Sequence, residues 1–361
     1  MKNRISAKTV TEAARETRVA HQTDVVVVGG GPAGVAAAVA AARNGSRVAL
    51  VERYGHLGGM ATGGLVILVP FLSDGTKQQV LAGLMQEMVE RLDARKAALY
   101  PKKEEWGVSD EQSLRKWRRR GTGSYVSGGR VRYSVTVDPE MLKCVLNDMV
   151  AEAGVKLYLH SWATNAIAEN NQVQGMVFES KSGRQAILSE LTVDCTGDGD
   201  MFASVGAEFD GSVDRSLRTA NLAMVFRIGN VDAEKYVDFR DDQPEKHEAM
   251  MKELMAMGGF ETYWRTTRED VFWCNNRLRN LNCLSVEDLT FAEVSGRKSM
   301  LTSLDYLRKN IPGFENCYIV DTCSQIGTRG SRRLKGVHTL TWDEVTSGVI
   351  HEDAVVVSSH L

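Results

Sequence analysis

The sequence has 361 residues and a formal net charge of −2, and 43% of its residues are hydrophobic and 25% charged. A chain of this length exceeds the usual size of one hydrophobic core, so we expect two domains. The near-neutral charge gives no excess of basic residues for binding nucleic acid, and no apolar stretch is long enough to cross a bilayer. Residues 1–23 lack the apolar core of a secretory signal, so we expect a cytoplasmic protein without a membrane partner.

The first predicted element is a valine-rich strand at residues 24–28, which runs into a cluster of glycines. A helix is expected next, because Pro32 suits a first helical turn and the alanine-rich run 35–42 favours helix. Asn44 and Gly45 supply a helix stop, and residues 46–51 are predicted to form a second strand. Strand, helix and strand within about 30 residues form a βαβ unit.

The pattern then changes several times along the chain. Residues 81–92 carry apolar side chains at helical spacing, whereas residues 100–132 are rich in charge, glycine and serine and predict a long loop or lid. Asp138 and Pro139 predict the start of a helix, and residues 156–193 are typical of a β-meander with short turns. A second glycine-bearing turn follows at residues 194–200.

The remaining elements complete the predicted fold. Residues 207–316 indicate a mixed α+β segment, whose clearest element is a helix at 286–309 with Ser285 as its cap. We expect an α/β fold with a split Rossmann-like domain and an inserted substrate domain. The expected bounds are 1–206 for the first domain, including loop 100–132 and meander 156–193, then 207–316 for the insertion, and 317–361 for an incomplete return to the first domain.

The glycine cluster between the first strand and helix has the pattern G-x-G-x-x-G, in Gly29 to Gly34. Gly29 permits a tight turn, Gly31 lets the backbone approach a pyrophosphate, and Gly34 lets the helix pack closely on the strand. Phosphates would meet the free N–H groups at the N-terminus of the helix. Glu52 ends the second strand about 20 residues later, where a carboxylate accepts hydrogen bonds from ribose hydroxyls. The pattern therefore predicts a dinucleotide site.

Two further features favour FAD over NAD, although both cofactors present an ADP half to such a unit. Residues 55–64 form a second glycine cluster directly after Glu52, which lets the backbone run beside the far half of an elongated cofactor. The strand end at 194–200 carries Gly and Asp residues that can return to the same cofactor. An NAD-dependent dehydrogenase remains the alternative.

An ordered set of stretches, spread over nearly the whole chain, carries a family resemblance. They are residues 14–17, 24–34, 50–64, 137–143, 194–200, 224–227, 311–316 and 325–333. With the loop Glu-Arg-Tyr-Gly-His-Leu-Gly-Gly-Met-Ala-Thr among them, the chain resembles the FAD-dependent oxidoreductases of the glutathione-reductase-like superfamily, and within it a bacterial group labelled simply FAD-dependent oxidoreductase.

The resemblance implies a set of cofactor-binding residues. Gly29, Gly31, Gly34 and Glu52 would hold the ADP part, with Pro32, Ala33 and Arg53 beside them, Gly58 and Gly59 would contact the pyrophosphate or flavin edge, and Thr196, Gly197 and Asp198 would contact the middle of FAD. Members of the group usually continue with a strand and a glycine- and alanine-rich helix that reach the flavin, and this sequence ends without them. We therefore expect a homo-oligomer or a partner chain to complete the flavin site. The alternative is a non-catalytic nucleotide-binding subunit or a truncated remnant that needs such a chain.

The predicted reaction is hydride transfer between a small organic substrate and flavin N5, for which the protein supplies orientation, charge and a proton path. His56 is a candidate proton donor or flavin attachment point, and the alternative is a loop histidine without a role. Arg329 and Arg332 are candidates for holding a carboxylate or oxyanion, and the alternative is a solvated basic face. The six cysteines contain no C-x-x-C pair, and the other histidines show no metal-ligand spacing, so we assign no metal.

Overall fold

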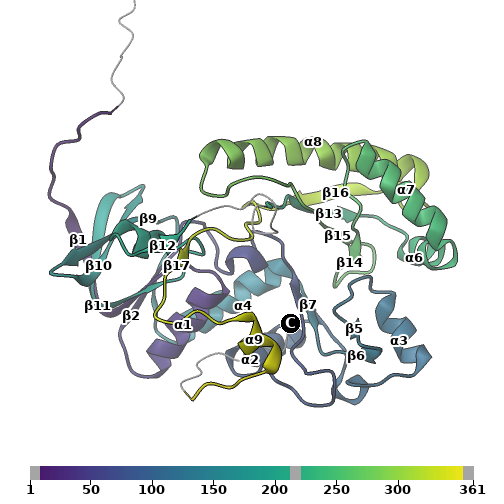
Figure 1. Ribbon diagram of the computed structural model, residues 1–361, viewed down its shortest axis with the longest axis horizontal. Coiled ribbons are helices and arrows are strands. Elements are labelled where there is room, and N and C mark those ends of the chain that lie inside the picture. Colours follow the sequence, from purple (N-terminus) through teal and green to yellow (C-terminus); the bar gives the residue numbers. More distant parts are fainter. Residues whose placement is uncertain (1–8, 212–220, 353–361) are drawn as a thin grey trace, which may run out of the picture.

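The computed structural model describes residues 9–211 and 221–352, and its main feature is a six-stranded sheet in the order β8-β2-β1-β11-β10-β9 (Figure 1). The strands β8, β2, β1 and β11 run parallel to one another. The strands β11, β10 and β9 form an antiparallel meander. Their bounds, in sheet order, are Lys156–Tyr158, Val48–Val51, Arg18–Val28, Gly183–Asp194, Gln172–Ser180 and Trp162–Glu169.

The predicted βαβ unit is present, with α1 at Pro32–Arg43 between β1 and β2. Every residue of β2 is buried, as is typical of a parallel strand covered on both faces. Strand β1 begins earlier than predicted, at Arg18, because it pairs along most of the length of β11. The helices α2 at Leu84–Ala94 and α4 at Pro139–Glu152 contact each other beside this sheet.

A second, four-stranded sheet has the order β14-β15-β13-β16 and is antiparallel throughout. Its strands are Trp264–Arg265, Phe272–Asn275, Val225–Gly229 and Tyr318–Thr322. The helices α6, α7 and α8 accompany it (Figure 1), at Ala233–Asp242, Pro244–Ala256 and Val286–Asn310. The Ser285 side chain caps α8 by accepting from the Asp288 N–H, which confirms the predicted cap. The buried core beside this sheet is rich in aromatic rings and includes Tyr236, Phe272 and Phe314.

The remaining elements are short. A three-stranded sheet has the order β3-β7-β4, with bounds Leu68–Val69, Val135–Val137 and Ala98–Leu99. The strands β12 and β17 pair at Phe209–Asp210 and Arg333–Leu334. The short helices are η1 at Gly59–Ala61, η2 at Lys103–Glu105, α5 at Asp200–Ser204 and α9 at Trp342–Ser347.

The prediction of a long loop at residues 100–132 is wrong. This segment contains helix α3 at Glu111–Arg118 and a hairpin of β5 (Val126–Ser127) and β6 (Arg130–Val131). The helix is capped by Asp110, and its few apolar side chains form a small core with the hairpin, made of Leu114, Trp117, Tyr125 and Val131. The core residues are separated in sequence by charge and glycine, so no periodicity revealed them.

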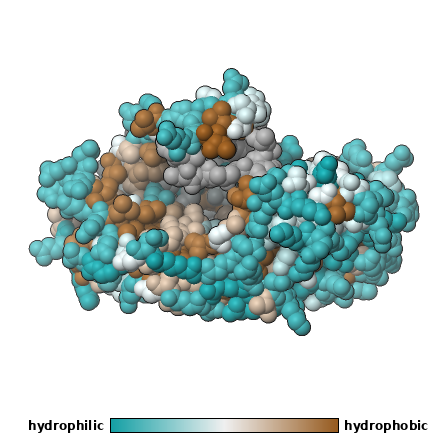
Figure 2. All heavy atoms as spheres, turned by 90° about the horizontal axis from the view of Figure 1, so that it is seen from below, coloured by the Kyte–Doolittle hydropathy of each residue, from teal (hydrophilic) through white to brown (hydrophobic). Residues whose placement is uncertain are grey.

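The face of the molecule seen from below in Figure 2 is hydrophilic along its outer margin, and apolar side chains gather towards its middle. Among residues 9–211 and 221–352, no helix is long and apolar enough to cross a membrane.

The small core around α3 makes a testable prediction. Trp117 is 3% exposed and its ring nitrogen donates to Glu105 Oε1 at 3.0 Å. Replacing a buried aromatic residue by alanine costs about 3–5 kcal/mol, so Trp117→Ala should speed tryptic cleavage after residues 118–120 by at least about tenfold. Trp342→Ala is the matched control, because that side chain is 76% exposed. Equal cleavage rates in the two variants would show that the segment is held by other contacts.

Candidate active site

The candidate ligand-binding cleft lies where β1, β2 and β11 end. Val28 is paired with Val51 on one side and Asp194 on the other, so the residues that follow these three strands arrive side by side. They line a cavity of about 220 Å³ together with parts of residues 59–60, 161–163 and 325–328. In open parallel sheets, ligands bind in the crevice at the carboxyl ends of the strands. The geometry therefore places the dinucleotide fingerprint in a pocket of the expected kind.

The glycines of the fingerprint bring strand, helix and neighbouring turn into close contact. Gly29 has φ +104°, and a Cβ there would lie 2.2 Å from the Cys195 carbonyl oxygen. A Cβ on Gly34 would lie 1.7 Å from the Gly29 carbonyl oxygen, so α1 can approach β1 only because residue 34 is glycine. A Cβ on Gly31 would meet no atom within 4 Å, and Gly31 lines the cavity with Pro32 and Ala33 at the start of α1. The positive end of that helix thus meets open space suited to a phosphate.

Glu52 is buried, at 6% exposure, and lines the same cavity. Its Oε2 accepts from the Gly30 N–H at 2.6 Å, and its Oε1 accepts from the Tyr54 N–H at 2.8 Å. Sequence reasoning expected only a ribose contact and missed these two bonds. A carboxylate oxygen can accept more than one hydrogen bond, so both oxygens retain capacity for a ligand while the backbone holds the carboxylate in place.

The second glycine cluster packs directly on the fingerprint. The Gly58 N–H donates to the Gly30 carbonyl at 2.8 Å, and a Cβ on Gly59 would lie 2.9 Å from Gly31 Cα. Gly59 lines the cavity. Arg53 also lines it, with its guanidinium 5.3 Å from the centre of the Trp162 ring.

The turn after β11 is organised by Asp194, which sequence reasoning did not single out. Its Oδ1 accepts from the Thr196 N–H and hydroxyl, and its Oδ2 accepts from the N–H groups of Met201 and Phe202. Thr196, Gly197 and Asp198 consequently line the cavity, beside the fingerprint turn. An aspartate at a strand end just before a glycine-bearing turn was the available signal, because such side chains commonly accept from nearby N–H groups.

The Arg332 side chain donates hydrogen bonds to the turn at residues 194–200. Its Nη1 donates to the Asp198 carbonyl and to Asp200 Oδ1, both at 2.8 Å, and Ser331 Oγ donates to Asp198 Oδ1 at 2.7 Å. Arg329 lies apart from these bonds, with its Nη2 donating to Asn275 Oδ1 at 3.4 Å. The two arginines that the sequence grouped thus donate to different partners.

His56 lies on the protein side of the glycine loop and does not line the cavity. Its Nε2 is 3.2 Å from Ser324 Oγ, its Nδ1 is 3.3 Å from Thr62 Oγ1, and its ring stacks on Tyr54. Burial lowers the pKa of this imidazole below its usual value near 6.5. The ring is thus neutral at pH 7, and it links the glycine loop to the segment after β16.

A family model described as FAD dependent oxidoreductase matches residues 24–360 of the chain. A soluble pyridine nucleotide transhydrogenase from Chromohalobacter salexigens is 55% identical over 42 residues, which are 12% of this chain and 9% of that protein.

Two solved structures are similar in fold. A geranylgeranyl bacteriochlorophyll reductase-like protein from Thermoplasma acidophilum has a TM-score of 0.49 and 16% identity, over 85% of this chain and 66% of that one. A p-nitrophenol 4-monooxygenase from Pseudomonas putida has a TM-score of 0.49 and 12% identity, over 87% of this chain and 69% of that one. The chain thus spans less than two thirds of the transhydrogenase and of the reductase-like protein.

The four bonds accepted by Asp194 generate a prediction. In Asp194→Asn the amide nitrogen cannot accept, so at least one backbone N–H loses its partner at a cost of about 1–3 kcal/mol. The free energy of unfolding in urea should fall by that amount. Asp305→Asn, on the exposed side of α8, is the matched control and should leave it unchanged. Equal stability of both variants would mean that the turn does not depend on Asp194.

Proposed function

The chain belongs to the FAD-dependent oxidoreductase family, and from that membership we propose that it transfers a hydride between a small organic substrate and N5 of bound FAD. FAD is the cofactor of the family, which decides between FAD and NAD. We also propose that the chain falls within the glutathione-reductase-like superfamily, on the strength of the loop at residues 52–62. The observation that carries the proposal is the pocket formed where β1, β2 and β11 end.

The ADP half of FAD is assigned to the fingerprint side of the cleft. Gly31, Pro32 and Ala33 would face the pyrophosphate, supported by the open space beside Gly31 and the start of α1. Gly29 and Gly34 would hold strand and helix close enough to form that surface. Glu52 would accept from the ribose hydroxyls, supported by its burial and its two backbone bonds.

The rest of the cofactor is assigned to the second glycine cluster and to the turn after β11. We assign Gly59 and Arg53 to the pyrophosphate or flavin edge, because both line the cleft, and Gly58 acts through its backbone bond to Gly30. Thr196, Gly197 and Asp198 would contact the middle of FAD, since the turn held by Asp194 presents them to the cavity.

Bound FAD would supply the hydride acceptor, and the protein supplies orientation and a route for protons. A neutral His56 can accept a proton released from substrate and return it in the reverse direction. Its proximity to Ser324 and Thr62 supports this role, since both hydroxyls can relay a proton. Arg332 is proposed as a positioning residue, through its bonds to Asp198 and Asp200. Arg329, whose Nη2 donates to Asn275 Oδ1, is proposed as the group that holds an anionic substrate.

The domain division is likewise a proposal, with bounds 1–206 and 207–316 and a return to the first domain afterwards. The return is proposed at residues 317–361, and its first strand, β16, pairs with β13 of the second sheet. A cytoplasmic location is proposed from the six cysteines, which are all free thiols, as is typical of a reducing compartment. A second copy or another chain is proposed to cover the cleft near Trp162, which lines it and is 56% exposed.

The cofactor assignment is tested by titration calorimetry with the full chain. FAD should bind more tightly than NAD or NADP, because the cleft continues past the fingerprint along residues 195–198 and a carboxylate at the ribose position repels a 2′-phosphate. A small organic substrate should then reduce the flavin bound to the purified protein, and a dye-coupled assay should record its reoxidation. An equal or greater affinity for NAD would contradict the assignment.

The ribose contact is tested with Glu52→Ala. Hydrogen bonds to a charged group are worth about 1.5–3 kcal/mol, so the affinity for FAD should fall by on the order of tenfold to a hundredfold. Glu90→Ala, on the exposed face of α2, is the control and should leave the affinity unchanged. The free energy of unfolding without FAD, measured in parallel, separates loss of the ribose contact from loosening of the turn. An unaltered affinity in Glu52→Ala would place the ribose elsewhere.

A further inference from the structure

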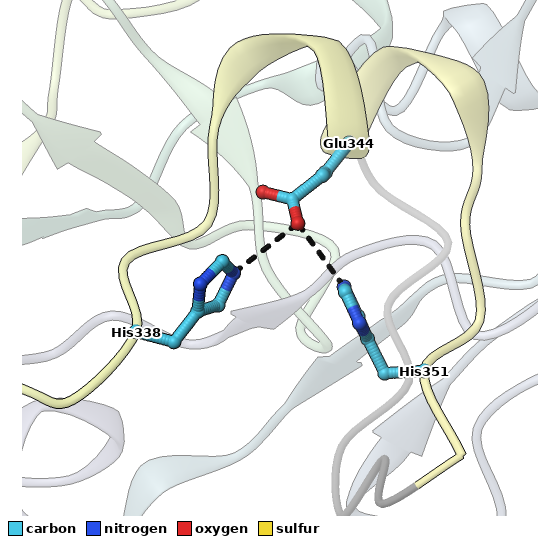
Figure 3. Close-up of side chains that lie close together, drawn as sticks. All are labelled: His338, Glu344 and His351. Carbon is cyan, nitrogen blue, oxygen red and sulfur yellow. Dashed lines mark ion pairs between the residues drawn. The ribbon is translucent and has the colours of Figure 1, made fainter.

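Three side chains around α9, far from the flavin cleft in sequence, point toward one another. Figure 3 shows His338 on the segment before α9, Glu344 on the helix itself and His351 on the segment after it. Their ligating atoms all lie within 4.8 Å of one another. The Nε2 atoms of His338 and His351 are 3.2 Å and 3.6 Å from the same oxygen, Glu344 Oε1. None of the three lines the cleft assigned to FAD.

The carboxylate of Glu344 is held in a fixed orientation. Its other oxygen, Oε2, accepts from the Thr341 N–H at 2.7 Å and from the Thr341 hydroxyl at 2.8 Å, within a capping box. Oε1 is therefore left to face the two imidazoles.

His351 supplies an independent indication of a missing ligand. Its Nε2 is buried from solvent and has no hydrogen-bond partner among the described residues. The 3.6 Å to Glu344 is too long for a hydrogen bond. A buried ring nitrogen without a partner costs free energy, and this one is directed at the anionic oxygen across a gap (Figure 3).

The spacing matches the coordination of a small transition-metal cation. Zinc bonds of 2.0–2.1 Å in tetrahedral geometry place neighbouring ligand atoms about 3.3 Å apart, close to the 3.2 Å and 3.6 Å observed. Two imidazoles and one carboxylate are a ligand set that suits such ions. We propose that His338, Glu344 and His351 bind one Zn²⁺ ion or a cation of the same class, with the fourth position left to water.

The bound ion would stabilise the segment from His338 to His351, which contains α9. Neighbouring side chains such as Val337, Leu340 and Trp342 are exposed, so the segment has little apolar burial to hold it. An ion that binds only the folded arrangement stabilises it by mass action. It would join the residues on both sides of α9, as the dashed lines of Figure 3 indicate for the side chains themselves.

The test uses the full chain without a polyhistidine tag, stripped with a chelator and titrated with ZnCl₂ in a calorimeter. One Zn²⁺ should bind per chain, with or without FAD. His338→Asn, His351→Asn and Glu344→Gln should each weaken binding by at least about tenfold, the lower end of what loss of a supporting residue costs in known sites. The matched control is His160→Asn, an exposed histidine whose positive φ of 51° suits asparagine. It should leave the affinity unchanged.

A second measurement does not depend on how the variants fold. In the wild-type chain, Zn²⁺ should protect His338 and His351, but not His160, from acylation by diethyl pyrocarbonate, as mapped by mass spectrometry. Mg²⁺, which prefers oxygen ligands in octahedral geometry, should protect none of them. The proposal is overturned if wild-type chain binds no Zn²⁺, if the three site variants bind it as well as His160→Asn does, or if Zn²⁺ leaves the two histidines as reactive as His160.

Discussion

The register of β1 against its two parallel neighbours determines the site. Val28 is paired with Val51 and with Asp194, so Gly29, Glu52 and Cys195 leave the sheet at the same level. A shift of either neighbour would move one wall of the cleft by a residue and turn its side chains to the other face. Backbone bonds from Gly29 to Val51 and from Cys195 to Val28, both 2.8 Å, extend the pairing one step beyond the strands.

The same register brings glycines and carboxylates together at the strand ends, where they have different structural roles. Glycines permit contacts that a Cβ would block, as between Gly29 and Cys195. Carboxylates then fix the loops that glycine alone leaves free, with Glu52 accepting from two N–H groups on one wall and Asp194 accepting four bonds on the other. Hydrogen bonds at the strand ends therefore hold the loops that line the cleft. The residues that face the cleft do not have to supply these bonds themselves.

Local signals explain what the sequence predicted well. The βαβ unit and the capped helix α8 each depend on neighbours in sequence, and the structure has both. The meander predicted at residues 156–193 is confirmed for β9, β10 and β11 but is wrong for β8, which pairs in parallel with β2 at the other edge of the sheet. The small core around Trp117 was missed because its members are few and lie among charges. The role of Asp194 had a local signal, an aspartate just before a glycine-bearing turn, which sequence reasoning did not use. The role of Arg332 depends on contact between segments distant in sequence, and His338 and His351 are brought together by the fold around α9, so no spacing rule indicated these three residues.

Ion pairs connect the C-terminal end of α3 to α6. Arg119 pairs with Glu234, Asp238 and Asp241, and Arg265 also pairs with Glu234. Most of these carboxylates are well exposed, so water can replace each partner when the pair separates. Dissolved salt should therefore weaken the ion pairs between the end of α3 and α6, whereas the apolar core that α3 forms with the β5-β6 hairpin does not depend on charge.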